Sequence, residues 1–176
     1  GNSTTVDAAL TSVSGDILVD SAVNLHQAGL IISTSRDVGL IAGGTLTQAT
    51  GGDITTGGDV LVEAGGDWTM AGDAMITAGG DVDGQALSGD LTLGVIDSTN
   101  VALTAGGSIT DANAGSMNIM ADNLSLRAEG GLIGDHDNAN GTPGQNANAI
   151  DITVSTLAAN AESGIYISEA DGLAIT

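Results

Sequence analysis

The feature that most constrains this chain is a 22-residue stretch that is written twice in succession. The first copy, DVGLIAGGTLTQATGGDITTGG, occupies residues 37–58, and the second, DVLVEAGGDWTMAGDAMITAGG, occupies residues 59–80; a third copy begins at once with Asp81. Repetition at a fixed period of this length is typical of proteins whose units bury their apolar faces only against neighbouring units. The sequence therefore predicts a solenoid.

Apolar residues alternate with other residues inside each copy. In the second copy Val60, Val62 and Ala64 are separated by single residues, and this period of two predicts strands. A Gly-Gly or Gly-Asp pair closes each strand, where the chain needs a positive φ or a tight corner. Three short strands and three corners per copy predict an all-β, right-handed parallel β-helix of about eight coils of roughly 22 residues over the 176 residues.

The interior of this solenoid must be built from small side chains. Phe is absent, and Trp and Tyr occur once each, so Val, Ile, Leu and Ala must fill the core. Trp68 occupies the position of Leu46 in the preceding copy, which favours a core or corner position over an exposed sugar-stacking position. In the earlier stretch GLIIST we expect Leu30 and Ile32 to point inward.

The charge of the chain is strongly one-sided. Two arginines, no lysine and 22 acidic residues give a formal net charge of −20. Nucleic acid and anionic membrane surfaces are excluded as partners, because both are bound through Lys and Arg. We expect the acids to form a solvated outer surface that keeps a long β-structure soluble. The alternative is that some of them bind Ca²⁺, which prefers oxygen ligands.

Two clusters of acidic residues are dense enough to be weighed as metal sites, namely 81–84 (DVDG) and 135–138 (DHDN). Neither is a complete EF-hand loop, and the GGxGxDxUx repeat of calcium-binding toxins is absent. We therefore expect both clusters to form Asp/Asn turns. If a cation binds, the candidate calcium ligands are Asp135, Asp137 and Asn138; no other cofactor is expected.

Catalytic equipment is sparse. Enzymes that cleave acidic polysaccharides need aspartates beside Lys or Arg, whereas Arg36 and Arg127 lie 91 positions apart. The chain also lacks cysteine and with it any thiolate site. We expect no enzymatic activity; hydrolysis of a neutral glycan by paired aspartates is the remaining enzymatic hypothesis.

One segment interrupts the strand pattern. Residues 134–149 are rich in Asp, Asn, Gly and Gln and contain the only proline, which predicts a polar loop insertion. Strands resume at Ile150. We expect residues 1–176 to form a single β-helical module, and because neither end shows a polar cap, we expect that module to belong to a tandem array.

The coils of GGDVxLxAGG type, the stretch LSLRAEGGLIGD (124–135) and the segment IDITVSTLAANAESGIYISEADGLAIT (150–176) resemble the β-helical repeats of filamentous-haemagglutinin-type proteins. These are very large surface adhesins and exoproteins of Gram-negative bacteria. The NPNL or NPNGI motif of their amino-terminal secretion domain is absent here.

The resemblance thus implies an extracellular or cell-surface shaft, a structural spacer that projects a distal binding domain and whose partners are neighbouring repeat modules of the same polypeptide. The alternative is an adhesion module that itself binds calcium, a glycan or a host protein through its acidic face or the 134–149 loop.

Overall fold

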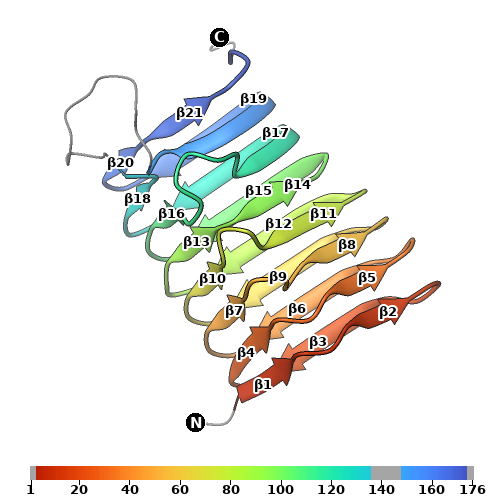
Figure 1. The fold of residues 1–176 in the computed structure, drawn as a ribbon. Coiled ribbons are helices and arrows are strands. Elements are labelled where there is room, and N and C mark those ends of the chain that lie inside the picture. The colour runs from red at the N-terminus through yellow and green to blue at the C-terminus, as the bar shows by residue number, and fades with distance from the viewer. Residues whose placement is uncertain (1–2, 136–147, 174–176) are drawn as a thin grey trace.

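The computed structural model describes residues 3–135 and 148–173, and these residues form a parallel β-helix (Figure 1). Every strand pairing within them is parallel, and each strand of the internal coils pairs with strands of the coils before and after it. The first coil consists of β1 (Ser3–Val6), β2 (Leu10–Ser12) and β3 (Ile17–Ser21). The predicted all-β solenoid is confirmed. No helix in the described ranges is long and apolar enough to cross a membrane.

The strands are arranged on three faces. The first face holds eight strands within the described residues: β1, β4 (Asn24–Gln27), β7 (Leu46–Gln48), β10 (Trp68–Met70), β13 (Leu91–Leu93), β16 (Ile109–Asp111), β18 (Leu132–Ile133) and β20 (Gly164–Ile165). The second face holds β2, β5 (Ile31–Ser33), β8 (Ile54–Thr56), β11 (Met75–Ala78), β14 (Val95–Asp97) and β21 (Ile167–Glu169). The third face holds β3, β6 (Val38–Ala42), β9 (Val60–Ala64), β12 (Asp81–Ala86) and β15 (Asn100–Ala105).

Two longer strands, β17 (Ile119–Ala128) and β19 (Ile150–Ala161), belong to both the second and the third face. Ile119 of β17 pairs with Ile96 of β14, and Leu124 of the same strand pairs with Val101 of β15. One continuous strand therefore turns the corner that short strands and glycines make in earlier coils. The second and third faces are joined in this way into a single thirteen-stranded sheet.

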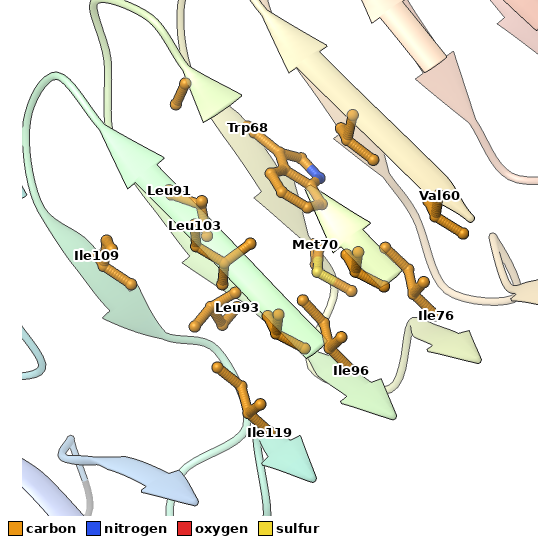
Figure 2. Close-up of a cluster of buried hydrophobic side chains, with 14 of the residues drawn as sticks. Val60, Trp68, Met70, Ile76, Leu91, Leu93, Ile96, Leu103, Ile109 and Ile119 are labelled. Carbon is orange, nitrogen blue, oxygen red and sulfur yellow. The ribbon is translucent and has the colours of Figure 1, made fainter. Parts of the chain in front are cut away.

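Equivalent residues of successive coils stack into columns inside the helix. The column on the second face is built from Ile31, Ile54, Ile76, Ile96, Ile119 and Ile152, all fully or almost fully buried. The alternation predicted around Val60, Val62 and Ala64 is confirmed, because all three are buried while Leu61 is exposed. Aliphatic side chains thus fill the interior, as Figure 2 shows for the central coils.

Trp68 is the one large aromatic side chain of this core, and it is completely buried (Figure 2). It stacks between Leu46 and Leu91, and its Nε1 donates a hydrogen bond to Oε1 of the buried Gln48 at 3.0 Å. Gly84 provides the space, since a Cβ there would lie 2.3 Å from Cζ3 of Trp68. Residues 81–84 therefore do not form the predicted Asp/Asn turn; they belong to β12.

The prediction for the stretch GLIIST is wrong by one residue. Ile31 and Ser33 are buried, whereas Leu30 is exposed and Ile32 only half-buried. The corner extends through Leu30, so β5 begins at Ile31. Three consecutive apolar residues fit either phase of a two-residue period, and the buried Ser33 satisfies its hydroxyl by donating to the Gly15 carbonyl at 3.3 Å.

The paired glycines at the corners are required by close packing of the backbone. At Gly65 a Cβ would lie 2.2 Å from the carbonyl oxygen of Gly43 in the coil below. Of the described glycines, those with positive φ are Gly51, Gly115, Gly134 and Gly172. A positive φ therefore applies at the pairs Gly51-Gly52 and Gly134-Asp135, whereas close backbone packing is the reason for glycine at pairs such as Gly43-Gly44 and Gly65-Gly66.

The predicted polar insertion lies between β18 and β19. The chain leaves the coil after Ile133 and rejoins it at Ile150, and the backbone N–H of Asp135 donates to the carbonyl of Asn148 at 2.8 Å. The two ends of the segment are therefore hydrogen-bonded to each other. The solenoid continues after the insertion, since Ile152 of β19 pairs with Ile119 of β17.

Candidate functional site

The predicted calcium ligands fall at the start of this insertion. Asp135 is exposed at its first corner, whereas Asp137 and Asn138 lie outside the described residues. Within residues 3–135 and 148–173, no group of three or more His, Cys, Asp or Glu side chains is placed to hold a metal ion. Calcium binding at this segment therefore stays a prediction.

A ladder of polar side chains runs along the corner that precedes the third face. We call it the Asp column; its members, one per coil, are Asp16, Asp37, Asp59, Asp81, Asn100 and Asn123. Oδ1 of Asp37 accepts the backbone N–H of Asp59 at 3.0 Å, and Oδ1 of Asp59 accepts that of Asp81 at 2.9 Å.

The ladder continues through amide side chains. Asn100 Nδ2 donates to Asp81 Oδ1 at 2.6 Å, and Asn123 Nδ2 donates to Asn100 Oδ1 at 2.7 Å. The Asp column thus links five successive coils from Asp37 to Asn123 along one corner.

The same device recurs at the corner that precedes the first face. Oδ1 of Asn24 accepts the N–H of Thr45 at 3.0 Å, Oδ1 of Asp67 accepts the N–H of Asp90 at 3.0 Å, and Oδ1 of Asp90 accepts the N–H of Ser108 at 2.7 Å. An amide or carboxylate oxygen serves equally in this role. These side chains satisfy backbone donors that the turn leaves without a strand partner.

The acids at the corners therefore have a structural role that the sequence analysis missed. Composition indicated only a solvated acidic surface, and the capping residues are indeed mostly exposed. The missed signal was periodicity, because Asp37, Asp59 and Asp81 each follow the point where one strand ends and stand 22 residues apart. A polar residue that recurs at the structural period is placed to bond its own equivalent in the next coil.

A shallow groove lies beside the Asp column on the outer surface of the third face. We call it the acidic groove; it has a volume of about 360 Å³, and its outward-facing lining is Asp16, Asp37, Asp59, Asp81 and Asp83 with Leu18, Gly39 and Leu61. The surface continues into a second groove of about 460 Å³, lined by Asp81, Asp83, Asn100, Ala102, Asn123, Ser125, Thr156 and Ala158 among others.

The carboxylates of the acidic groove are not neutralised by basic side chains. Within the described residues the one ion pair joins Arg127 and Glu129, at 3.2 Å on the exposed surface, and pairs of this kind contribute little to stability. Asp16, Asp37 and Asp59 are exposed and stand on successive coils about 4.8 Å apart. Arg36 precedes Asp37 in the chain but forms no ion pair with the described residues and does not line the groove, so the groove is a strip of carboxylates without ion pairs beside the exposed Leu18 and Leu61.

A second polar cluster lies inside the later coils. Oδ1 of Asp111 accepts Nδ2 of Asn118 at 2.8 Å and the N–H of Asn113 at 2.7 Å, and Oδ1 of Asn118 accepts the N–H of Asp151 at 2.9 Å. The other oxygens of this group, Asp111 Oδ2, Asn113 Oδ1 and Asp151 Oδ2, are buried without a hydrogen-bond partner. The cluster ties β16 to β19 at the cost of unsatisfied acceptors.

Glu169 stands at the end of the isoleucine column, because it pairs with Ile152. Burial raises the pKa of its carboxyl above the ordinary value of 4.5, and a hydrogen bond with the Asp171 side chain acts in the same direction. Oε2 of Glu169 is buried without a hydrogen-bond partner. A column of apolar side chains is thus closed by an acid whose pKa is raised.

Comparison of the chain with protein-family models, with curated proteins and with solved structures finds no match in any of the three.

Proposed function

We propose that this chain is a structural spacer module of a large bacterial cell-surface or secreted adhesin, which projects a distal binding domain away from the cell. The observation that carries the proposal is the unbroken stack of parallel strands from β1 to β21, supported by filled core columns. A spacer needs stiffness along its axis but needs no ligand of its own. In the β-helix, contacts within the chain provide that stiffness.

The stiffness follows from the way each coil is held. β12, for example, pairs along its length with β9 on one side and with β15 on the other, and the Asp column adds one side-chain hydrogen bond per coil at the corner. Bending the stack would separate strands and open a core column at the same time. Both losses are unfavourable, because buried backbone groups without partners cost free energy.

The proposed partners are neighbouring repeat modules of the same polypeptide. The first-face column is fully buried at Ile133 but 45% exposed at Ile165, its next member. Leu10 and Ile17 at the opposite end are likewise only half-buried. A further coil stacked at either end would bury these side chains in the same way that the internal coils bury each other.

Absence of catalysis is part of the proposal. Asp37, Asp53, Asp59, Asp67 and Asp90 cap backbone donors at the corners, and no basic side chain of the described residues lines the acidic groove. Such a surface offers no group to stabilise a developing negative charge.

The spacer role is tested by measuring reach against module number. One, two and three copies of this chain are placed between a membrane anchor and a fluorophore, and the height of the fluorophore above the membrane is measured by energy transfer. A rigid spacer predicts a linear rise of roughly 38 Å per copy, from about eight coils of about 4.8 Å. Growth with the square root of copy number, as for a flexible linker, would overturn the proposal.

A further inference from the structure

We propose that the acidic groove is a docking surface for an extended, cationic polypeptide segment in which basic and apolar side chains alternate. The proposal goes beyond the spacer role, because it gives the side of the shaft a partner of its own. It rests on three properties of the groove: exposed apolar side chains, regularly spaced carboxylates and the absence of compensating positive charge.

The apolar part of the groove is built from the outward residues of β3, β6 and β9. Leu18 is 65% exposed and Leu61 is 39% exposed, and they stand on either side of Gly39 in the strand register. A Cβ at Gly39 would lie 2.9 Å from Cδ1 of Leu18, so the glycine leaves a depression into which Leu18 leans. Large exposed leucines around such a depression are unfavourable in water and favour a partner with apolar side chains.

The charged part of the groove has a spacing that an extended chain can match. From Asp16 to Asp81 the column crosses three coil intervals of about 4.8 Å, or roughly 14 Å. In an extended segment every second side chain points the same way at about 6.8 Å, so three alternate basic residues also span roughly 14 Å. The intervening apolar residues of that segment point to the other side, toward Leu18 and Leu61.

The carboxylates are held in place but keep a free acceptor. Oδ1 of Asp37 and Oδ1 of Asp59 accept backbone N–H groups of the next coil, which fixes the orientation of each carboxylate. Oδ2 of each carboxylate is then presented to a Lys or Arg donor, and charge-assisted hydrogen bonds of this kind are stronger than neutral ones. Because the carboxylates are already ordered, little side-chain entropy is lost on binding.

The proposed partner is cationic because, within the described residues, the carboxylates of the groove have no positively charged neighbours in ion-pair contact. Stacked carboxylates repel one another, and the one ion pair in the described part of the chain, Arg127 with Glu129, lies elsewhere. A basic segment relieves that repulsion and is steered toward the groove. The row of carboxylates in the Asp column ends at Asp81, because the next two members of the column are the uncharged Asn100 and Asn123.

The test compares two variants that lose the same charge. A fluorescent eight-residue peptide of alternating lysine and leucine is titrated with the full chain, and binding is read as fluorescence anisotropy. The groove variant carries Asp37→Asn, Asp59→Asn and Asp81→Asn; the control variant carries Asp53→Asn, Asp67→Asn and Asp90→Asn at other corners. Asparagine keeps the capping oxygen, as Asn24 already does in this chain, so both variants should retain the fold.

We expect the control to bind within about twofold of the unmodified chain and the groove variant to bind at least about tenfold more weakly. Replacing both Leu18 and Leu61 by serine should weaken binding about threefold or more. Equal losses in the two charge variants would mean non-specific attraction to an acidic protein and would overturn the proposal. Failure of the unmodified chain to bind the peptide would do the same.

A measurement on the unmodified chain covers the case in which a variant does not fold. Carbodiimide cross-linking joins the lysines of the bound peptide to the carboxylates that they contact, and mass spectrometry locates the links. The proposal predicts links concentrated on Asp16, Asp37, Asp59, Asp81 and Asp83. Links spread evenly over the acids of all three corners would contradict it.

Discussion

The coils before Asp111 and the coils after it satisfy their polar groups in different ways. In the earlier coils a polar residue bonds the equivalent position one coil away, as Asp59 does with the N–H of Asp81, or reaches a neighbouring column, as Gln48 does with Trp68. Among the described residues of the later coils, buried oxygens remain without partners at Asp111, Asn113, Asp151 and Glu169; among those of the earlier coils this holds for Gln27 alone. Where the coils repeat regularly, the same side-chain hydrogen bond can recur in each of them.

The difference begins at the corner between β16 and β17. The corner after β16 is lengthened, and it contains Ala114 and Gly115, both with positive φ. Asp111 stands in the column that Leu93 occupies one coil earlier, so a carboxylate replaces an aliphatic side chain near the core. The coil is then closed by local bonds among Asp111, Asn113 and Asn118. Irregular coils therefore depend on particular side chains rather than on the repeat.

The largest effect is expected where the regular half is filled most tightly. Gly84→Val places a side chain against both Trp68 and Leu103 and should destabilise the fold by about 3 kcal/mol through overpacking. Adding Trp68→Leu, which makes that position resemble Leu46 and Leu91, should recover the part of the loss that comes from Trp68. Urea unfolding of both single variants and the double variant checks this, and additive losses would contradict the proposed size compensation.

A smaller effect is expected at the caps of the same half. Asp59→Ala removes the acceptor for the N–H of Asp81 and should cost about 1 kcal/mol. Asp59→Asn keeps an acceptor and should change the free energy of unfolding by less than about 0.5 kcal/mol. The two variants are compared by urea unfolding at neutral pH. Equal destabilisation would show that the charge, and not the cap, is what matters.

In the irregular half, removal of a charge should be tolerated. Asp111→Asn keeps Oδ1 as acceptor for Asn118 and Asn113 and removes a carboxylate that has a buried, unpartnered oxygen. We expect unchanged or slightly higher stability, by up to about 1 kcal/mol. Clear destabilisation in the same unfolding assay would show that the charged oxygen has a partner after all.

The smallest effect concerns pH at the end of the stack. The pKa of Glu169 is raised in the folded chain, mainly by burial, so the folded state retains this proton at a pH where the unfolded state has lost it. Its contribution to stability is therefore complete below pH 4.5 and is lost as the pH rises through the folded pKa. Glu169→Gln should show a smaller decrease of Tm from acid to neutral pH than the unmodified chain. Parallel Tm curves would contradict this.

Much of the fold could be predicted because its signals are local and repeated. The 22-residue period and the alternation around Val62 each led to a feature that the structure confirms, whereas most of the predicted loop 134–149 lies outside the described residues. The phase at Leu30 could not be predicted, because consecutive apolar residues carry no period. The pairing of Trp68 with Gly84 was also hidden, since the two residues lie 16 positions apart and meet only because the coil closes.

The candidate site was less predictable than the fold. Composition showed the excess of acids, but the acidic groove depends on which acids share a corner, and that follows from strand register. Asp16 and Asp81, for example, belong to one column although they are 65 residues apart in the sequence. Density along the sequence pointed to 81–84, of which Asp81 and Asp83 line the groove, and to 135–138, but not to Asp16, Asp37 and Asp59. In a solenoid, acids gather across coils rather than along the chain.

The most direct test of the central claim, that this stack of coils holds itself together without a ligand, is thermal unfolding followed by circular dichroism. The chain is heated in EDTA, in millimolar CaCl₂ and in matched MgCl₂, which controls for general screening of the acidic surface. A ligand that binds only the folded state raises Tm. Our account predicts a β-type spectrum and the same Tm in CaCl₂ as in MgCl₂. A rise of many degrees specific to calcium, or a helical spectrum, would contradict it.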